Sequence, residues 1–143
     1  MNEKFIQAHM KVAETYAALS YAKRLKVGAI VVKDNRVISI GYNGTPAGWN
    51  NNCEHAILND NNEYELKTKP EVIHAEANAI AKLARTHESG EGADMFVTHA
   101  PCLDCAKIIY GAGIRQVYFK TPYRDDAGIH FLNQCNIGVE QVE

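Results

Sequence analysis

Two short motifs in the middle of the chain contain residue types that could hold a metal ion. They are H-A-E at residues 74–76 and P-C-L-D-C at residues 101–105. The imidazole of His74 and the thiolates of Cys102 and Cys105 form a ligand set that suits Zn²⁺. Three protein ligands leave the fourth tetrahedral position open, as in catalytic zinc sites, where a water occupies it. The pKa of such a water falls toward neutrality, so the motifs predict hydrolytic chemistry.

The spacing within each motif fits the start of a helix. Glu76 follows His74 by two residues, so at a helix start it points in a different direction from the ligand and can reach a water without binding the metal. A general acid or base needs that position. Cys102 and Cys105 are three residues apart, so on the first helical turn both sulfurs face the same way. The N-terminus of a helix also favours thiolates.

Three other interpretations of these residues compete with a catalytic zinc. The two closely spaced cysteines could form a redox dithiol, or the histidine could be a buried residue with no metal. A structural zinc with four protein ligands would need a further ligand from Cys53, His55 or Cys135. We favour a catalytic zinc because Glu76 and Pro101 lie where that chemistry needs them. We expect one zinc ion per chain.

The H-x-E and P-C-x-x-C pair is the signature of the zinc-dependent nucleobase deaminases. The chain resembles the cytidine and deoxycytidylate deaminase superfamily over most of its length, and within it most resembles the deoxycytidylate (dCMP) deaminases. The matching segments follow the family's order; they are VGAIVV (27–32), GYNGTPAG (41–48), HAEANAI (74–80), VTHAPCLDCAKII (97–109) and GAGIRQVYF (111–119).

This resemblance implies an activity and roles for single residues. The reaction would be the zinc-dependent hydrolytic deamination of dCMP to dUMP and ammonia, a step in pyrimidine deoxynucleotide supply, with Glu76 as the proton carrier. The remaining expected substrate contacts are Asn43 to the sugar, the N–H of Ala75 to the base carbonyl, Val27 and Ala29 along the base, and Tyr123 near the substrate. Four of them have a purely structural alternative: a turn residue for Asn43, and core packing for Val27, Ala29 and Tyr123.

A monophosphate substrate requires hydrogen-bond donors, and basic residues cluster just before the first expected strand. Among them, Arg24 and Lys26 are the phosphate candidates, because the family also carries basic residues in this region. The alternative is a solvated basic end of the preceding helix, which the helix dipole favours by itself.

The resemblance also implies regulation and assembly. Relatives with this pattern are commonly homohexamers that dCTP activates and dTTP inhibits, with Mg²⁺ on the effector triphosphate. The corresponding effector residues would be Asn43, Gly44, Lys82 and Arg85, although Arg85 could equally be a surface charge. Allosteric regulation requires two sites and two states, which no single sequence can show.

The elements that must position these residues follow from hydrophobic periodicity. Their order predicts an α/β, three-layer, cytidine-deaminase-like fold, with a mixed central sheet of about five strands and helices on both faces, in a single catalytic domain over residues 1–143. We expect helices at 3–22, 74–86, 102–110 and 126–134, a hairpin of strands 27–32 and 36–41 around Asp34-Asn35, and strands at 95–98, 117–119 and 137–142.

The polar, asparagine-rich stretch at residues 45–69 has two interpretations. Long irregular loops in compact domains often act as lids or binding loops. The alternative is a tolerated surface insertion, with a short helix at residues 53–60.

Composition limits the class of partner. The 143 residues carry a net charge of −2 and are 46% hydrophobic, which predicts a globular domain with no face for long nucleic acid. This disfavours the alternative of a tRNA adenosine or guanine deaminase. A non-catalytic zinc protein that binds nucleotides is disfavoured by Glu76, for which it has no use. The sequence shows no signal peptide and no apolar run long enough to span a membrane, so we expect a cytoplasmic protein.

Overall fold

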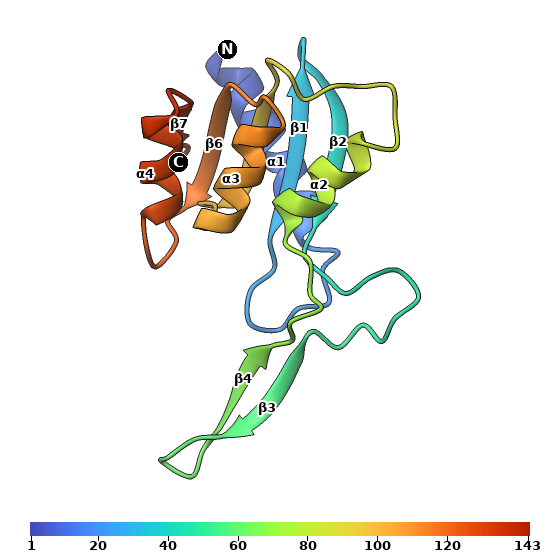
Figure 1. Cartoon of the computed structure of the whole chain (residues 1–143), viewed down its shortest axis with the longest axis vertical. Helices are drawn as coiled ribbons and strands as arrows, with labels where there is room; N and C mark the ends of the chain where they lie inside the picture. The colour runs from blue at the N-terminus through green and yellow to red at the C-terminus, as the bar shows by residue number, and fades with distance from the viewer.

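The computed structural model describes residues 1–143, and a five-stranded sheet forms its centre (Figure 1). The strand order is β2-β1-β5-β6-β7. The strand β1 pairs antiparallel with both β2 and β5, whereas β5, β6 and β7 are parallel to one another. The strands of this sheet are β1 (Gly28–Lys33), β2 (Arg36–Tyr42), β5 (Asp94–His99), β6 (Gln116–Thr121) and β7 (Gly138–Gln141). The predicted mixed sheet is therefore confirmed.

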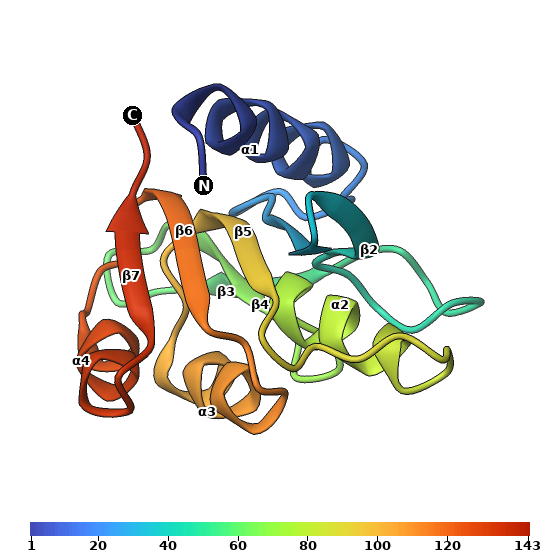
Figure 2. The ribbon, with the colours of Figure 1, turned by 90° about the horizontal axis from the view of Figure 1, so that it is seen from above.

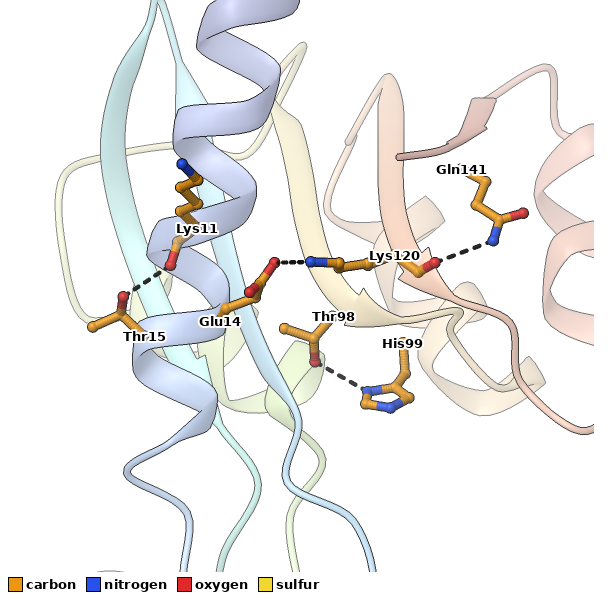
Figure 3. Close-up of polar contacts among 7 residues, drawn as sticks. All are labelled: Lys11, Glu14, Thr15, Thr98, His99, Lys120 and Gln141. Carbon is orange, nitrogen blue, oxygen red and sulfur yellow. Dashed lines mark hydrogen bonds and ion pairs between the residues drawn. The ribbon is translucent and has the colours of Figure 1, made fainter. Parts of the chain in front are cut away.

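Helices cover both faces of the sheet, which makes three layers (Figure 2). On one face lies α1 (Glu3–Ala17), and on the other lie α2 (Ala75–Leu83), α3 (Leu103–Gly111) and α4 (Ala127–Gln134). An ion pair of 2.7 Å between Lys120 Nζ and a Glu14 carboxylate oxygen joins α1 to β6 (Figure 3). Lys120 also accepts a hydrogen bond from the side chain of Gln141 on its backbone oxygen, which links β6 to β7. No helix combines the length and the apolar character needed to cross a bilayer.

Alternation along the strands creates two cores, because successive side chains of a strand point to opposite faces. In β1, Ala29 and Val31 face the three-helix side, whereas Ile30 and Val32 face α1. The central strand β5 repeats this alternation, with Phe96 on the α1 side. The second core is completed by the stacked rings of Phe96 and Tyr118, whose centroids are 4.6 Å apart.

Glycine lets α2 approach the sheet closely. A methyl group added at Gly41 in β2 would overlap the carbonyl oxygen of Ala75 and would come within 2.6 Å of the backbone nitrogen of Ala79. Both alanines are completely buried. The first turn of α2 therefore lies directly on β2, and this contact sets the height of the H-A-E motif above the sheet.

The asparagine-rich stretch forms a second, two-stranded sheet, so the helix predicted at 53–60 is wrong. Strands β3 (Glu54–Leu58) and β4 (Tyr64–Thr68) pair antiparallel and extend away from the body (Figure 1). The turn between them is made by asparagines: the Asn59 side chain accepts hydrogen bonds from the N–H groups of Asn61 and Glu63, and Asn62 has a φ of +62°. This turn chemistry favours a hairpin over a helix.

Two predicted helices end early. The first stops at Ala17 rather than near residue 22, because the residues that follow make tertiary hydrogen bonds in place of helical ones. The Ser20 hydroxyl donates to the backbone oxygen of Asn43, and the Glu54 carboxylate accepts the backbone N–H of Lys23. The second stops at Leu83, so Arg85 lies beyond the helix and not on its third turn. The Asp34-Asn35 hairpin turn is confirmed, with φ values of 51° and 61°.

We predict that Gly41→Ala lowers the free energy of unfolding by about 1–3 kcal/mol, since the added methyl group must push α2 away from β2. Urea unfolding followed by circular dichroism measures the change. Gly44→Ala is the matched control, because nothing lies within 4 Å of the position of its added methyl group, and it should be neutral. Equal stability of the two variants would contradict the proposed contact.

Candidate active site

Two helix starts bring the expected metal ligands together. His74 is the N-cap of α2 and Cys102 the N-cap of α3, each with an extended backbone and no capping hydrogen bond from its side chain. Both side chains are therefore free to point at a common ligand, and Cys105 joins them from the first turn of α3. The positive ends of two helix dipoles meet at this point, which favours negatively charged thiolates.

The three ligand atoms have the separations that a tetrahedral zinc requires. His74 Nδ1 lies 3.2 Å from Cys105 Sγ and 3.6 Å from Cys102 Sγ. Zinc–nitrogen and zinc–sulfur bonds of ordinary length in a tetrahedron put these atoms about 3.5 Å apart. The three side chains form the chain's only group of three or more potential metal-ligating residues of this kind, and no fourth histidine, cysteine or acid joins them. The residues thus fit a zinc ion with an open position, and not a structural site with four protein ligands.

Neighbouring groups shift the pKa values of the two thiols in opposite directions. Hydrogen bonds from Cys105 and His74 lower the pKa of Cys102 to about 3. The pKa of Cys105 is raised, first because its proton makes the bond to Cys102 and then because it is buried. The pKa of His74 is raised by its hydrogen bond to Cys102. Protons shared in these hydrogen bonds therefore link the three ligand side chains. Binding of a metal cation at the same place would release them.

Glu76 is a buried acid in the first turn of α2, with only 4% of its surface exposed. Burial raises its pKa to about 7, an effect that the nearby His74 partly opposes. A carboxyl group with a pKa near neutrality can both take up and release a proton at physiological pH, as a general acid and base must. Its carboxylate is not part of the ligand cluster.

A cavity of about 440 Å³ opens beside the ligand cluster, within the size range of small-molecule sites. Eight residues singled out from the sequence line it, and they come from both helix starts, from the loops before β1 and after β6, and from the end of β2. They are Arg24, Val27, Asn43, His74, Ala75, Glu76, Cys102 and Tyr123. The long-range packing therefore gathers most of the predicted site into one place.

Six predicted site residues do not line this cavity. One is the metal ligand Cys105, which is buried in the first turn of α3, and the other five lie elsewhere. Ala29 is completely buried in the core between β1 and the helices, because it lies two residues inside the sheet, opposite Val97. Lys26 is exposed and does not line the cavity. The remaining three are the effector candidates Gly44, Lys82 and Arg85, of which the two basic residues are exposed.

Asn43 both lines the cavity and makes hydrogen bonds within the fold. Its side-chain oxygen accepts the N–H of Val27 at 2.9 Å, and its side-chain nitrogen donates to the carbonyl of Leu25 at 2.8 Å. The carboxamide thus clamps the loop before β1 and is more than a turn residue. The two bonds leave one amide hydrogen and one lone pair of this carboxamide unused, and the residue lines the cavity.

Several lining residues were missed by the sequence reasoning. His99, at the end of β5, is half-buried, and burial lowers its pKa. Its Nδ1 lies 3.1 Å from the hydroxyl of Thr98 (Figure 3), which in turn accepts the N–H of Gly28. Donation from this hydroxyl to Nδ1 corresponds to a neutral ring that carries its proton on Nε2. The sequence Thr98-His99-Ala100 directly precedes the cysteine motif, but its spacing matches no known ligand or catalytic pattern, so it did not indicate a site residue.

Two arginines, Arg24 and Arg124, line the cavity. Arg24 donates from its Nη1 to the Thr68 hydroxyl at 3.1 Å, and Arg124 lies over the ring of Tyr123, 5.6 Å from its centroid. Arg124 was also missed, since a lone exposed arginine in a loop carries no motif. Guanidinium groups that line a cavity can bind an anion.

Comparison with known proteins places the chain in a family of zinc-binding deaminases. The family described as the cytidine and deoxycytidylate deaminase zinc-binding region matches residues 3–121. The chain belongs to this family. Among curated relatives of this deaminase, the ComE operon protein 2 of Bacillus subtilis is 37% identical over 96% of the chain and 70% of its own length. The deoxycytidylate deaminase of Enterobacteria phage T4 is 37% identical over 68% of both chains.

A solved structure of the same family covers nearly the whole molecule. The dCMP deaminase from the cyanophage S-TIM5, in complex with dCMP and dUMP, is 42% identical, with a TM-score of 0.89 over 99% of both chains. The predicted three-layer deaminase fold is therefore confirmed.

We predict that the purified deaminase-family protein holds one zinc per chain by elemental analysis. Cys102→Ser and Cys105→Ser should each lose most of the metal, because a serine hydroxyl is a poor replacement for a thiolate. Cys135→Ser, which changes a half-buried cysteine outside the ligand cluster, is the matched control and should keep the metal. Two zinc ions per chain, or full occupancy in Cys102→Ser, would contradict this assignment.

Proposed function

We propose that this protein is a dCMP deaminase, which hydrolyses dCMP to dUMP and ammonia as a single catalytic domain. The observation that carries the proposal is the match over 99% of both chains to a dCMP deaminase solved with dCMP and dUMP. The cavity supports it, because a proton carrier, a zinc ligand set and two arginines line its walls. These groups suit a cytosine ring at one end and a phosphate at the other.

The residues divide the chemistry between them. His74, Cys102 and Cys105 would hold a zinc ion, which when bound polarises a water and makes it a nucleophile at neutral pH. Glu76 takes a proton from that water and delivers it to ring nitrogen N3. It then takes the proton of the hydroxyl group added at C4 and passes it to the amino group, which leaves as ammonia. The near-neutral pKa of this buried acid supports both transfers.

Backbone groups orient the base. Ala75 is the first residue of α2, so its N–H has no acceptor within the helix, and it lines the cavity. We assign this N–H to the base carbonyl oxygen. Val27 provides apolar contact with the ring from the loop before β1, and Asn43 offers its spare amide hydrogen to the sugar.

Regulation and assembly belong to the proposal through the family resemblance alone. We propose a homohexamer that dCTP with Mg²⁺ activates and dTTP inhibits. Lys82 at the end of α2 and Arg85 just beyond it are exposed and separate from the cavity, as a second binding site would require. A location in the cytoplasm stays a prediction.

We predict that Glu76→Gln lowers kcat on dCMP by about 10²- to 10⁴-fold, because the amide cannot carry a proton. The zinc content should stay at the wild-type level, since the Glu76 carboxylate is not part of the ligand cluster. Ammonia release from dCMP and elemental analysis of the same sample measure both quantities. Substantial turnover by this variant would disprove the role of Glu76.

We predict that Arg24→Ala lowers kcat/KM for dCMP by about 10- to 100-fold, through loss of a charge-assisted hydrogen bond to the phosphate. Deoxycytidine, which lacks the phosphate, should be affected much less. Lys26→Ala is the matched control, a nearby basic residue that does not line the cavity, and its kcat/KM should change less than about 2-fold. Equal losses on both substrates would contradict a phosphate contact.

A further inference from the structure

A second buried acid lines the cavity, and the deamination chemistry does not use it. Glu54 begins β3 and has only 4% of its surface exposed. One carboxylate oxygen, Oε2, accepts the backbone N–H groups of Lys23 at 2.8 Å and Arg24 at 3.0 Å. The other oxygen, Oε1, is buried with no hydrogen-bond partner, and no other buried side-chain oxygen or nitrogen of the chain lacks one.

A buried carboxylate oxygen that has no partner, on a residue that lines the cavity, indicates a ligand that donates a hydrogen bond. Leaving such an atom buried and unpaired destabilises a protein, so native structures satisfy nearly all of them. No cation of the chain pairs with Glu54, because the neighbouring Arg24 guanidinium donates to the hydroxyl of Thr68. The clamp on the loop backbone needs only Oε2, which leaves Oε1 free for a ligand.

Of the hydrogen-bond donors on the proposed substrate, only one can reach Oε1 of Glu54. Apart from its phosphate, dCMP carries two hydrogen-bond donors, the 4-amino group and the 3′-hydroxyl. The amino group is the one removed, so it must lie near His74 and Glu76. Glu54 instead binds the backbone of Arg24, the residue proposed for the phosphate, and the sugar joins phosphate to base.

We propose that Oε1 of Glu54 accepts a hydrogen bond from the 3′-hydroxyl of dCMP and selects for nucleotides that carry a donor there. This inference rests on the proposed function. It adds a residue that determines specificity for the sugar, contributed by the hairpin that extends from the body. The same carboxylate thereby ties the position of Arg24 to recognition of the hydroxyl group.

The first experiment needs no variant. Rates on dCMP and on 2′,3′-dideoxycytidine 5′-monophosphate, which lacks only the 3′-hydroxyl, give a ratio of kcat/KM values. A hydrogen bond to a carboxylate predicts a ratio of roughly 10 to 100 for the wild type. A ratio near one overturns the inference. An absence of dCMP turnover by the zinc-loaded wild type would instead overturn the proposed function, so the two failures are distinguishable.

The second experiment separates recognition from positioning. In Glu54→Gln the amide oxygen can keep both backbone N–H groups, but an NH₂ group replaces Oε1. This group can only donate to the hydroxyl oxygen, in a neutral hydrogen bond weaker than one to a carboxylate, so the ratio should fall to a few-fold. Thr68→Val is the matched control: it removes the acceptor of Arg24 Nη1, and should lower both rates while leaving the ratio unchanged. A wild-type ratio in Glu54→Gln shows that the hydroxyl is bound elsewhere and overturns the inference.

A third substrate keeps the test decisive if Glu54→Gln does not fold. The 3′-amino analogue of dCMP replaces the hydroxyl with a group that is a good donor to a carboxylate. The wild type should turn it over at least as well as dCMP. Rejection of this analogue to the level of the dideoxy compound would overturn the inference.

Discussion

The site depends on one packing constraint, the close approach of two helix starts to the sheet and to each other. Small residues permit it: Gly41 leaves room for the backbone of α2, and Ala75 and Ala79 are completely buried against β2. A larger side chain at any of these positions would lift α2 and separate the atoms of His74 and Cys105, which lie 3.2 Å apart. Interiors pack like crystals, so a displacement of this kind is not absorbed locally.

The same constraint separates the roles of two buried acids. Glu76 lies in the first turn of α2, where burial raises its pKa to about 7 and His74 partly opposes the shift. Glu54 is fixed by two backbone N–H groups at the base of the hairpin. One carboxyl group therefore suits proton transfer and the other suits recognition, although both line the same cavity. Environment, not residue type, assigns the role.

Local patterns predicted much of this molecule, because their physics is local. The Asp34-Asn35 turn, the alternating strands and the helix starts at His74 and Cys102 all follow from neighbours in sequence. The hairpin at 54–68 was misread, although Ala56, Leu58, Tyr64 and Leu66 follow a period of two that places them on one face. Asparagine-rich composition concealed the alternation.

The residues that were missed come from long-range packing. Glu54 and Arg24 are 30 positions apart, and only the tertiary fold shows that one binds the backbone of the other. His99 and Arg124 carry no motif, so nothing local separates them from surface residues. Ala29 was predicted to contact the base, but it does not line the cavity. It belongs to a matching segment, but its position inside β1 places it in the core, whereas Val27 before the strand reaches the cavity.

Charge shows why whole-chain composition predicts so little about a site of this kind. The net charge of −2 argued against long nucleic acid, yet two arginines and two glutamates line one cavity. Their contributions nearly cancel in the sum while remaining distinct in space. At close range in a partly buried cavity each charge is screened far less than on the surface, so position decides what binds. An anion and a hydrogen-bond donor on one sugar can therefore be recognised side by side, by Arg24 and by the carboxylate that holds its backbone.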